Sequence, residues 1–148
     1  QTRTSVVHGD FRIDNAIFDH NGPKCLAVLD WELSTIGDPL ADFSYVAMAW
    51  VTENGGRSGV KDLDRKALGI PELEEMVERY CAATGRDSIP DMNWYLAYNF
   101  FRLAGIMQGI KKRVIDGTAS SDHARQMSDR VFPLAKAAWE FAVKAGAQ

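Results

Sequence analysis

The sequence predicts an α+β fold that is mostly α, with one small β-hairpin followed by about four helices. Two observations predict this class. Short runs of strand-forming residues lie near the N-terminus, and apolar residues at helical spacing fill most of the chain after residue 38. With 148 residues, of which 46% are hydrophobic and 25% charged, the chain is long enough to form one domain around a single core.

Composition argues against two classes of partner. The net charge is -3 and the basic residues are scattered, so no nucleic-acid partner is expected. No apolar run reaches the ~18 residues that a membrane span needs, so no membrane partner is expected either. Two cysteines far apart, Cys25 and Cys81, are typical of free thiols in a reducing compartment, and we expect a cytoplasmic location.

The hairpin is predicted at residues 16–29. Strands at 16–18 and 25–29 are separated by Asn21-Gly22, a pair favoured in tight turns because both residues tolerate positive φ. Asn15 and Asp30 flank the two strands at the open end of the hairpin. The hairpin should therefore bring these two side chains together.

The first helix has a strong start signal. Asp38 can cap a helix and Pro39 suits its first position, which predicts a helix to about Val51. Residues 34–37 before it are expected to be a loop, and residues 52–69 after it a mobile surface loop that could act as a lid.

Three further helices are expected, over residues 71–84, 91–115 and 121–145. Asp91 should cap the second of these, whose apolar residues cover nearly its whole circumference and predict a central, buried helix. Pro133 should kink or split the last one near residues 129–133 because it removes a backbone hydrogen bond.

Three polar residues near the hairpin match the needs of phosphoryl transfer. Asp10 would align an attacking hydroxyl and accept its proton, because positioning counts for more than base strength in a loose transition state. Asn15 and Asp30 would bind magnesium, which keeps several waters and takes its other ligands from nucleotide phosphates. Each residue alone could instead cap a turn. Only the catalytic interpretation explains their joint spacing.

His8 and Asp42 are predicted to hold the loop that carries Asp10. His8 is expected to bond a backbone group through a ring nitrogen rather than to act as a general base. Asp42 would either benefit from the helix N-terminus or turn inward to accept backbone N–H groups, and we expect the inward orientation. Glu32 should share a face with Asp30 if the strand continues, and would then contact a second metal ion or a substrate amine; otherwise it is a solvated loop residue.

Tyr95, Asn99 and Arg102 fall within one narrow arc of the helix expected at 91–115, among apolar neighbours. A buried guanidinium needs an anion. The partner could be internal, such as Asp42 or Asp14. Alternatively, the three residues could line a substrate cleft in which Arg102 binds a carboxylate or phosphate.

Several segments together carry a family resemblance. They are His8-Gly9-Asp10-Phe11-Arg12-Ile13-Asp14-Asn15, Val28-Leu29-Asp30-Trp31-Glu32, Gly37-Asp38-Pro39-Leu40-Ala41-Asp42 and Asn99-Phe100-Phe101-Arg102-Leu103-Ala104 with Gln108-Gly109. The first three resemble the aminoglycoside phosphotransferase and choline kinase superfamily, whose fold is protein-kinase-like. The fourth is similar to the kinase-like domain fused to acyl-CoA dehydrogenases and to its bacterial stand-alone relatives. The resemblance implies that residues 1–148 are the C-terminal lobe of such a fold, with Asp10 as catalytic base and Asn15 and Asp30 as magnesium ligands.

The resemblance also implies an activity. The protein would be a kinase that moves the γ-phosphoryl group of ATP or GTP to a hydroxyl of a small molecule, with Mg²⁺, and the subgroup implies a hydroxyacyl acceptor. A choline- or aminoglycoside-type kinase stays open, because Trp31, Trp94 and Tyr95 could form an aromatic wall for a cation. A pseudokinase or docking domain is the alternative from another class, although no binding role requires all three catalytic residues.

The superfamily has an N-terminal lobe with a strand-borne lysine and a phosphate-covering loop, which residues 1–5 are too short to supply. The glycine-rich residues 55–61 lack the Gly-Lys-Ser/Thr ending of a phosphate loop and are expected to be solvated. Gln1 in place of Met, without a signal-peptide core after it, also predicts a fragment. The expected partners are the missing N-terminal lobe and a second copy bound through the exposed truncation surface.

The 148-residue chain alone is expected not to turn over ATP, because it lacks the lysine and the loop that would hold the phosphates. A nucleotide-turnover assay on the isolated chain, run beside the full-length protein, measures this. Kinase activity from the isolated chain would contradict the expectation.

Overall fold

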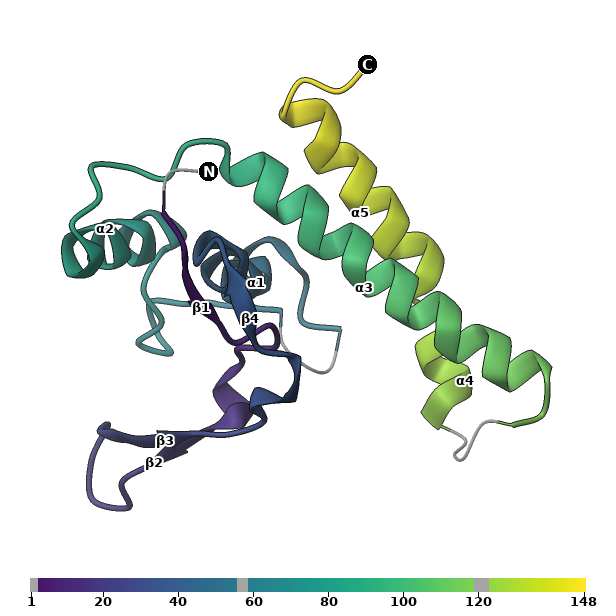
Figure 1. The fold of residues 1–148 in the computed structure, drawn as a ribbon, viewed down its shortest axis with the longest axis horizontal. Helices are drawn as coiled ribbons and strands as arrows, with labels where there is room; N and C mark the ends of the chain where they lie inside the picture. Colours follow the sequence, from purple (N-terminus) through teal and green to yellow (C-terminus); the bar gives the residue numbers. More distant parts are fainter. Residues whose placement is uncertain (1–2, 56–58, 119–122) are drawn as a thin grey trace. The chain divides into compact units, whose positions relative to one another are not determined.

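A computed structural model of the chain describes residues 3–55, 59–118 and 123–148. The chain divides into two compact units, Gln1–Pro90 and Asp91–Gln148. Within the described residues, the first unit holds the strands and two helices, and the second holds three helices (Figure 1). No helix in these ranges is long and apolar enough to cross a membrane.

The predicted hairpin is present, with a different turn. β2 (Ala16–Phe18) pairs antiparallel with β3 (Cys25–Val28), as Figure 1 shows. Neither Asn21 nor Gly22 has a positive φ, so the expected two-residue turn is wrong. Asp19 closes a longer loop instead: its carboxylate accepts the Asn21 N–H (2.8 Å), and its own N–H donates to the Lys24 carbonyl (2.8 Å). This side-chain contact replaces the tight turn.

A second small sheet lies where the sequence predicted a loop. β1 (Ser5–Val7) pairs antiparallel with β4 (Thr35–Gly37), so the loop expected at 34–37 is wrong. The pairing joins segments about thirty residues apart, and such a partner cannot be read from local composition. The segment between β1 and β4 therefore begins and ends at the same pair of strands.

The first two helices match their predicted positions. α1 (Leu40–Val51) begins after Asp38, whose carboxylate accepts the Leu40 N–H at 3.0 Å. Asp38 therefore caps α1, although the helix begins one residue later than expected. α2 (Leu73–Thr84) ends at Gly85, which adopts φ 61° and donates its N–H to Cys81.

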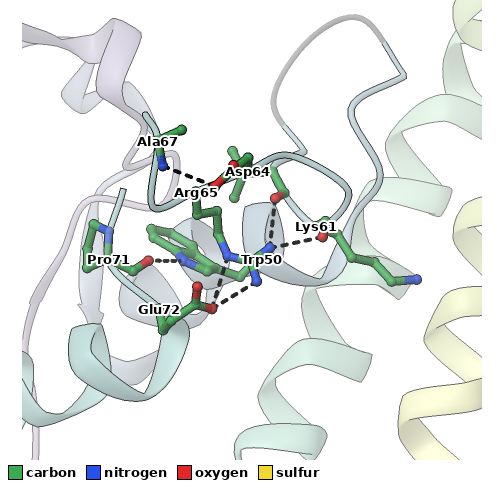
Figure 2. Close-up of polar contacts among 8 residues, drawn as sticks. Trp50, Lys61, Asp64, Arg65, Ala67, Pro71 and Glu72 are labelled. Carbon is green, nitrogen blue, oxygen red and sulfur yellow. Dashed lines mark hydrogen bonds and ion pairs between the residues drawn. The ribbon is translucent and has the colours of Figure 1, made fainter. Parts of the chain in front are cut away.

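One arginine and one tryptophan hold the segment between α1 and α2 (Figure 2). Arg65 donates to two backbone carbonyls of its own turn (3.0 and 2.9 Å) and to the Glu72 carboxylate (3.0 Å). The Trp50 indole N–H donates to the Pro71 carbonyl at 2.8 Å. The described part of the expected surface loop is therefore tied to both flanking helices, while residues 56–58 lie outside the described residues.

The second unit is a packed set of helices. α5 (Val131–Lys144) runs along α3 (Met92–Ile115), and α4 (His123–Ser128) precedes it (Figure 1). The break between α4 and α5 confirms the predicted split. Pro133 lies in the first turn of α5, where a missing N–H costs no helical hydrogen bond. The expected helix start at Ser121 lies outside the described residues.

Two expectations for α3 are wrong. Leu96 and Phe100 on one face are buried, but Phe101 is 72% exposed, so the helix is not buried all round. An apolar helix face is able to pack against another segment, but the apolar residues do not show that a segment lies there. Asp91 adopts φ 58° and makes no side-chain capping bond; its backbone carbonyl accepts the Trp94 N–H instead.

Leu134 is buried in α5, whereas Phe132 on the same helix is 78% exposed. Leu134→Ala should lower the free energy of unfolding by about 2–5 kcal/mol because it leaves a cavity. Phe132→Ala, the matched control, should change it by no more than about 0.5 kcal/mol. Equilibrium urea unfolding measures both. Equal losses for the two variants would contradict the described packing.

Candidate active site

The loop that carries Asp10 follows directly from β1. Val7 and His8 are buried, and Gly9 adopts φ 85°. A Cβ on Gly9 would lie 2.4 Å from the carbonyl oxygen of Leu33, so only glycine fits without movement of the backbone. This close approach sets the loop against the turn that follows the hairpin.

The Asp42 carboxylate holds the same loop from the other side. It accepts the backbone N–H of His8 at 2.6 Å and that of Gly9 at 2.9 Å. Asp42 lies in the first turn of α1, and its side chain points inward as the sequence predicted. Hydrogen bonds to an ionised acceptor are stronger than neutral ones, so this contact fixes two consecutive peptide units.

Both ring nitrogens of His8 bond to backbone groups. Nδ1 accepts the Asp10 N–H (3.2 Å), and Nε2 lies 2.7 Å from the Leu29 carbonyl. Because Nδ1 is an acceptor, the hydrogen is assigned to Nε2, which donates to Leu29. The imidazole therefore ties the Asp10 loop to the end of the hairpin, which is the kind of backbone contact expected of a loop-bracing His8.

Asn15 connects Asp10 to the hairpin. Its amide nitrogen donates to the Asp10 carbonyl at 2.9 Å and lies 3.4 Å from the Asp10 carboxylate. The backbone carbonyl of Asn15 accepts the Leu29 N–H at 2.8 Å, which extends the hairpin by one residue pair. Asn15 therefore lies opposite Leu29, the residue before Asp30. The backbones of Asp10, Asn15 and Asp30 therefore lie near one another at the open end of the hairpin.

Asp30, two residues after the end of β3, has a left-handed conformation with φ 67° and ψ 48°. Such a conformation costs of order 1 kcal/mol for a residue other than glycine and is concentrated at functional sites. The chain then enters the 3-10 turn Trp31–Leu33, where Glu32 is exposed. β3 ends at Val28 and does not continue to Glu32, so the condition under which Glu32 would share a strand face with Asp30 is not met.

The three candidate substrate residues on α3 belong to the second unit. Asn99 is fully buried, whereas Tyr95 and Arg102 are half-buried. The Tyr95 ring contacts that of Trp94 edge to face at 5.2 Å. A role of these residues at a substrate cleft stays a prediction.

Two side chains in the first unit have shifted pKa values. Burial lowers the pKa of Arg12, but the hydrogen bond and charge of Asp14 outweigh it, so the pKa lies above its ordinary value. Burial raises the pKa of Tyr80, against the opposing effect of Arg86. Arg12 is therefore charged and Tyr80 neutral at physiological pH.

Sequence reasoning missed Gly9 and Trp31 as residues that build the site. The signal for Gly9 was a glycine between His8 and Asp10. A glycine at such a position indicates a positive φ or a close approach of another backbone segment. The sequence suggested Trp31 only as part of an aromatic wall for a cation, and gave no signal for a contact with His8. Its ring packs against His8, with centroids 4.7 Å apart, and this contact depends on the fold.

Asp42→Asn should lower stability and activity together. The two carboxylate oxygens accept the N–H groups of His8 and Gly9, and the neutral amide has only one oxygen to accept them. We expect a loss of about 1–3 kcal/mol in the free energy of unfolding. Thermal unfolding and steady-state activity of the full-length protein measure the two effects. Lost activity at an unchanged Tm would point instead to a direct chemical role for Asp42.

Comparisons with known proteins identify the family of this chain. Residues 1–97 match the model of the Phosphotransferase enzyme family (APH). Acyl-CoA dehydrogenase family member 10 of Mus musculus is 46% identical over 148 residues, which are 99% of this chain and 14% of the relative. Acyl-CoA dehydrogenase family member 11 of Homo sapiens is 38% identical over 133 residues, 89% of this chain and 17% of the relative.

The chain thus spans less than a fifth of these curated relatives. A crystal structure of a candidate aminoglycoside phosphotransferase from Ralstonia eutropha JMP134 is 50% identical, with a TM-score of 0.91 over 95% of this chain and 43% of that chain. The family match covers more than half of the chain and the likeness extends to the structure. The chain therefore belongs to the phosphotransferase enzyme family and has a protein-kinase-like fold.

Proposed function

We propose that the protein transfers the γ-phosphoryl group of ATP or GTP to a hydroxyl group of a small molecule. The observation that carries this proposal is the Asn15 side chain, which contacts both the backbone and the carboxylate of Asp10. The same residue lies opposite Leu29, next to Asp30. Phosphoryl transfer would use the carboxylate of Asp10, the amide of Asn15 and the carboxylate of Asp30 at this end of the hairpin.

Asp10 would perform the proton transfer. The residue is half-buried, and its backbone donates a hydrogen bond to His8 on one side and accepts one from Asn15 on the other. It would accept a hydrogen bond from the acceptor hydroxyl and take the proton as the oxygen bonds to phosphorus. Fixed placement of this group supports catalysis because orientation supplies most of the rate gain in such reactions.

The donor set suits magnesium. The hydrogen bonds of the Asn15 side chain use its nitrogen, so its oxygen is directed away from the Asp10 carbonyl and could bind a cation. Asp30 adds a carboxylate, and both are hard oxygen donors. No group of three His, Cys, Asp or Glu side chains gathers within the described ranges, but magnesium completes its shell with waters and phosphates. When bound, it would neutralise charge on the phosphates.

We further propose that residues 1–148 act as the C-terminal lobe of this enzyme, together with an N-terminal lobe that holds the nucleotide. A hydroxyacyl compound is the acceptor we favour. Support comes from the relatives named acyl-CoA dehydrogenase family members 10 and 11, which are 46% and 38% identical to this chain. A candidate aminoglycoside phosphotransferase is also a neighbour, so aminoglycosides and choline belong in the same substrate panel.

Asp10→Asn in the full-length protein should lower kcat by about 10²–10⁴-fold, because it removes the proton acceptor. The variant should still bind nucleotide. Formation of ADP or GDP and phosphorylation of hydroxyacyl, aminoglycoside and choline acceptors measure the activity. Asp116→Asn, which removes an exposed ion pair with Lys112, is the matched control and should behave as wild type.

A magnesium-dependent thermal shift with ATP separates the enzyme from a pseudokinase. The wild-type protein should be stabilised by millimolar nucleotide and Mg²⁺ together, through the binding linkage. Absence of any shift, with no turnover of either nucleotide, would favour a docking domain over an enzyme.

A further inference from the structure

We propose that Trp31 is a positioning residue, which holds Asp30 in its left-handed conformation and in register with Asp10. This inference rests on the proposed function, because it assigns Asp30 to the metal. It differs from the expectation that Trp31 forms an aromatic wall for a cationic substrate. Three observations carry it.

The first observation is the backbone of Asp30. The direction of its carboxylate depends on φ 67° and ψ 48°, a conformation in which an aspartate is strained. A relaxed φ would turn the side chain away from its present direction. Contacts of the neighbouring residues must therefore hold the conformation in place.

The second observation is that Trp31 bonds back across Asp30. Its indole N–H donates to the Val28 carbonyl at 2.8 Å. This bond spans the two residues between them, Leu29 and Asp30, and closes the chain around the left-handed position. The indole nitrogen is thereby engaged by the protein's own backbone.

The third observation is the packing of the indole ring on His8. The ring centroids are 4.7 Å apart with an interplanar angle of 53°. His8 in turn bonds the Leu29 carbonyl with one nitrogen and the Asp10 N–H with the other. A continuous set of contacts therefore runs from Asp30 through Trp31 and His8 to Asp10. Removal of the indole would take away the ring that packs on His8 and the hydrogen bond that closes the turn at Asp30.

Trp31→Leu and Trp31→Phe in the full-length protein test the proposal. The leucine variant loses the ring and the N–H, and the phenylalanine variant keeps a ring against His8 but loses the bond to Val28. Trp139→Phe is the matched control, because Trp139 lies on α5 and is exposed to a similar degree. The measured quantities are kcat, the Mg²⁺ concentration for half-maximal activity, and the KM of the acceptor.

Trp31→Leu should lower kcat and raise the half-saturating Mg²⁺ concentration by about tenfold or more, the usual effect of losing a group that orients a metal ligand. The acceptor KM should not change. Trp31→Phe should fall between this variant and wild type, and Trp139→Phe should match wild type. A raised acceptor KM at unchanged Mg²⁺ dependence would overturn the proposal in favour of a substrate wall.

Two further results would also overturn it. One is a lower Tm for both Trp31 variants with wild-type kcat and Mg²⁺ dependence in the folded protein, which indicates a stability role only. The other comes from Mn²⁺ titrations with ATP, followed by electron paramagnetic resonance. Equal Mn²⁺ binding by wild type and Trp31→Leu would refute the positioning role alone, whereas no binding by wild type would remove the proposed function and this inference with it.

Discussion

The carboxylate of Asp42 accepts two consecutive backbone N–H groups, and the candidate site depends on this contact. It fixes the peptide units of His8 and Gly9 from the side of α1. With these units fixed, the His8 ring can reach the Leu29 carbonyl, and Gly9 can lie against Leu33. The helix thus sets the backbone on which the other polar contacts are built.

The left-handed backbone of Asp30 is held by the hydrogen bonds of its neighbours. A left-handed aspartate persists only where the surroundings over-determine it. Here the surroundings are hydrogen bonds on the preceding and following residues: Leu29 bonds to Asn15 and His8, and Trp31 bonds to Val28. These contacts of Leu29 and Trp31 therefore fix the backbone of Asp30, and such fixed backbone is typical of a site that is pre-organised before a ligand binds.

Local signals predicted much of the fold. The Asp38 cap, the Gly85 stop and the break before Pro133 are set by short-range chemistry, and the structure has all three. The spacing of Asp10, Asn15 and Asp30 likewise pointed to one end of a hairpin. The pairing of β1 with β4, the left-handed Asp30 and the exposed face of α3 were not predictable, because each depends on which distant segment lies against it.

The pairing of β1 with β4 also bears on how the molecule forms. The hydrogen bonds that build the candidate site all join residues between Ser5 and Asp42, although several of them connect segments far apart within that stretch. The entropy lost in closing such loops grows only slowly with their length. During synthesis this part of the chain leaves the ribosome before α3, α4 and α5 exist. The contacts of the site can therefore form before the helices of the second unit are synthesised.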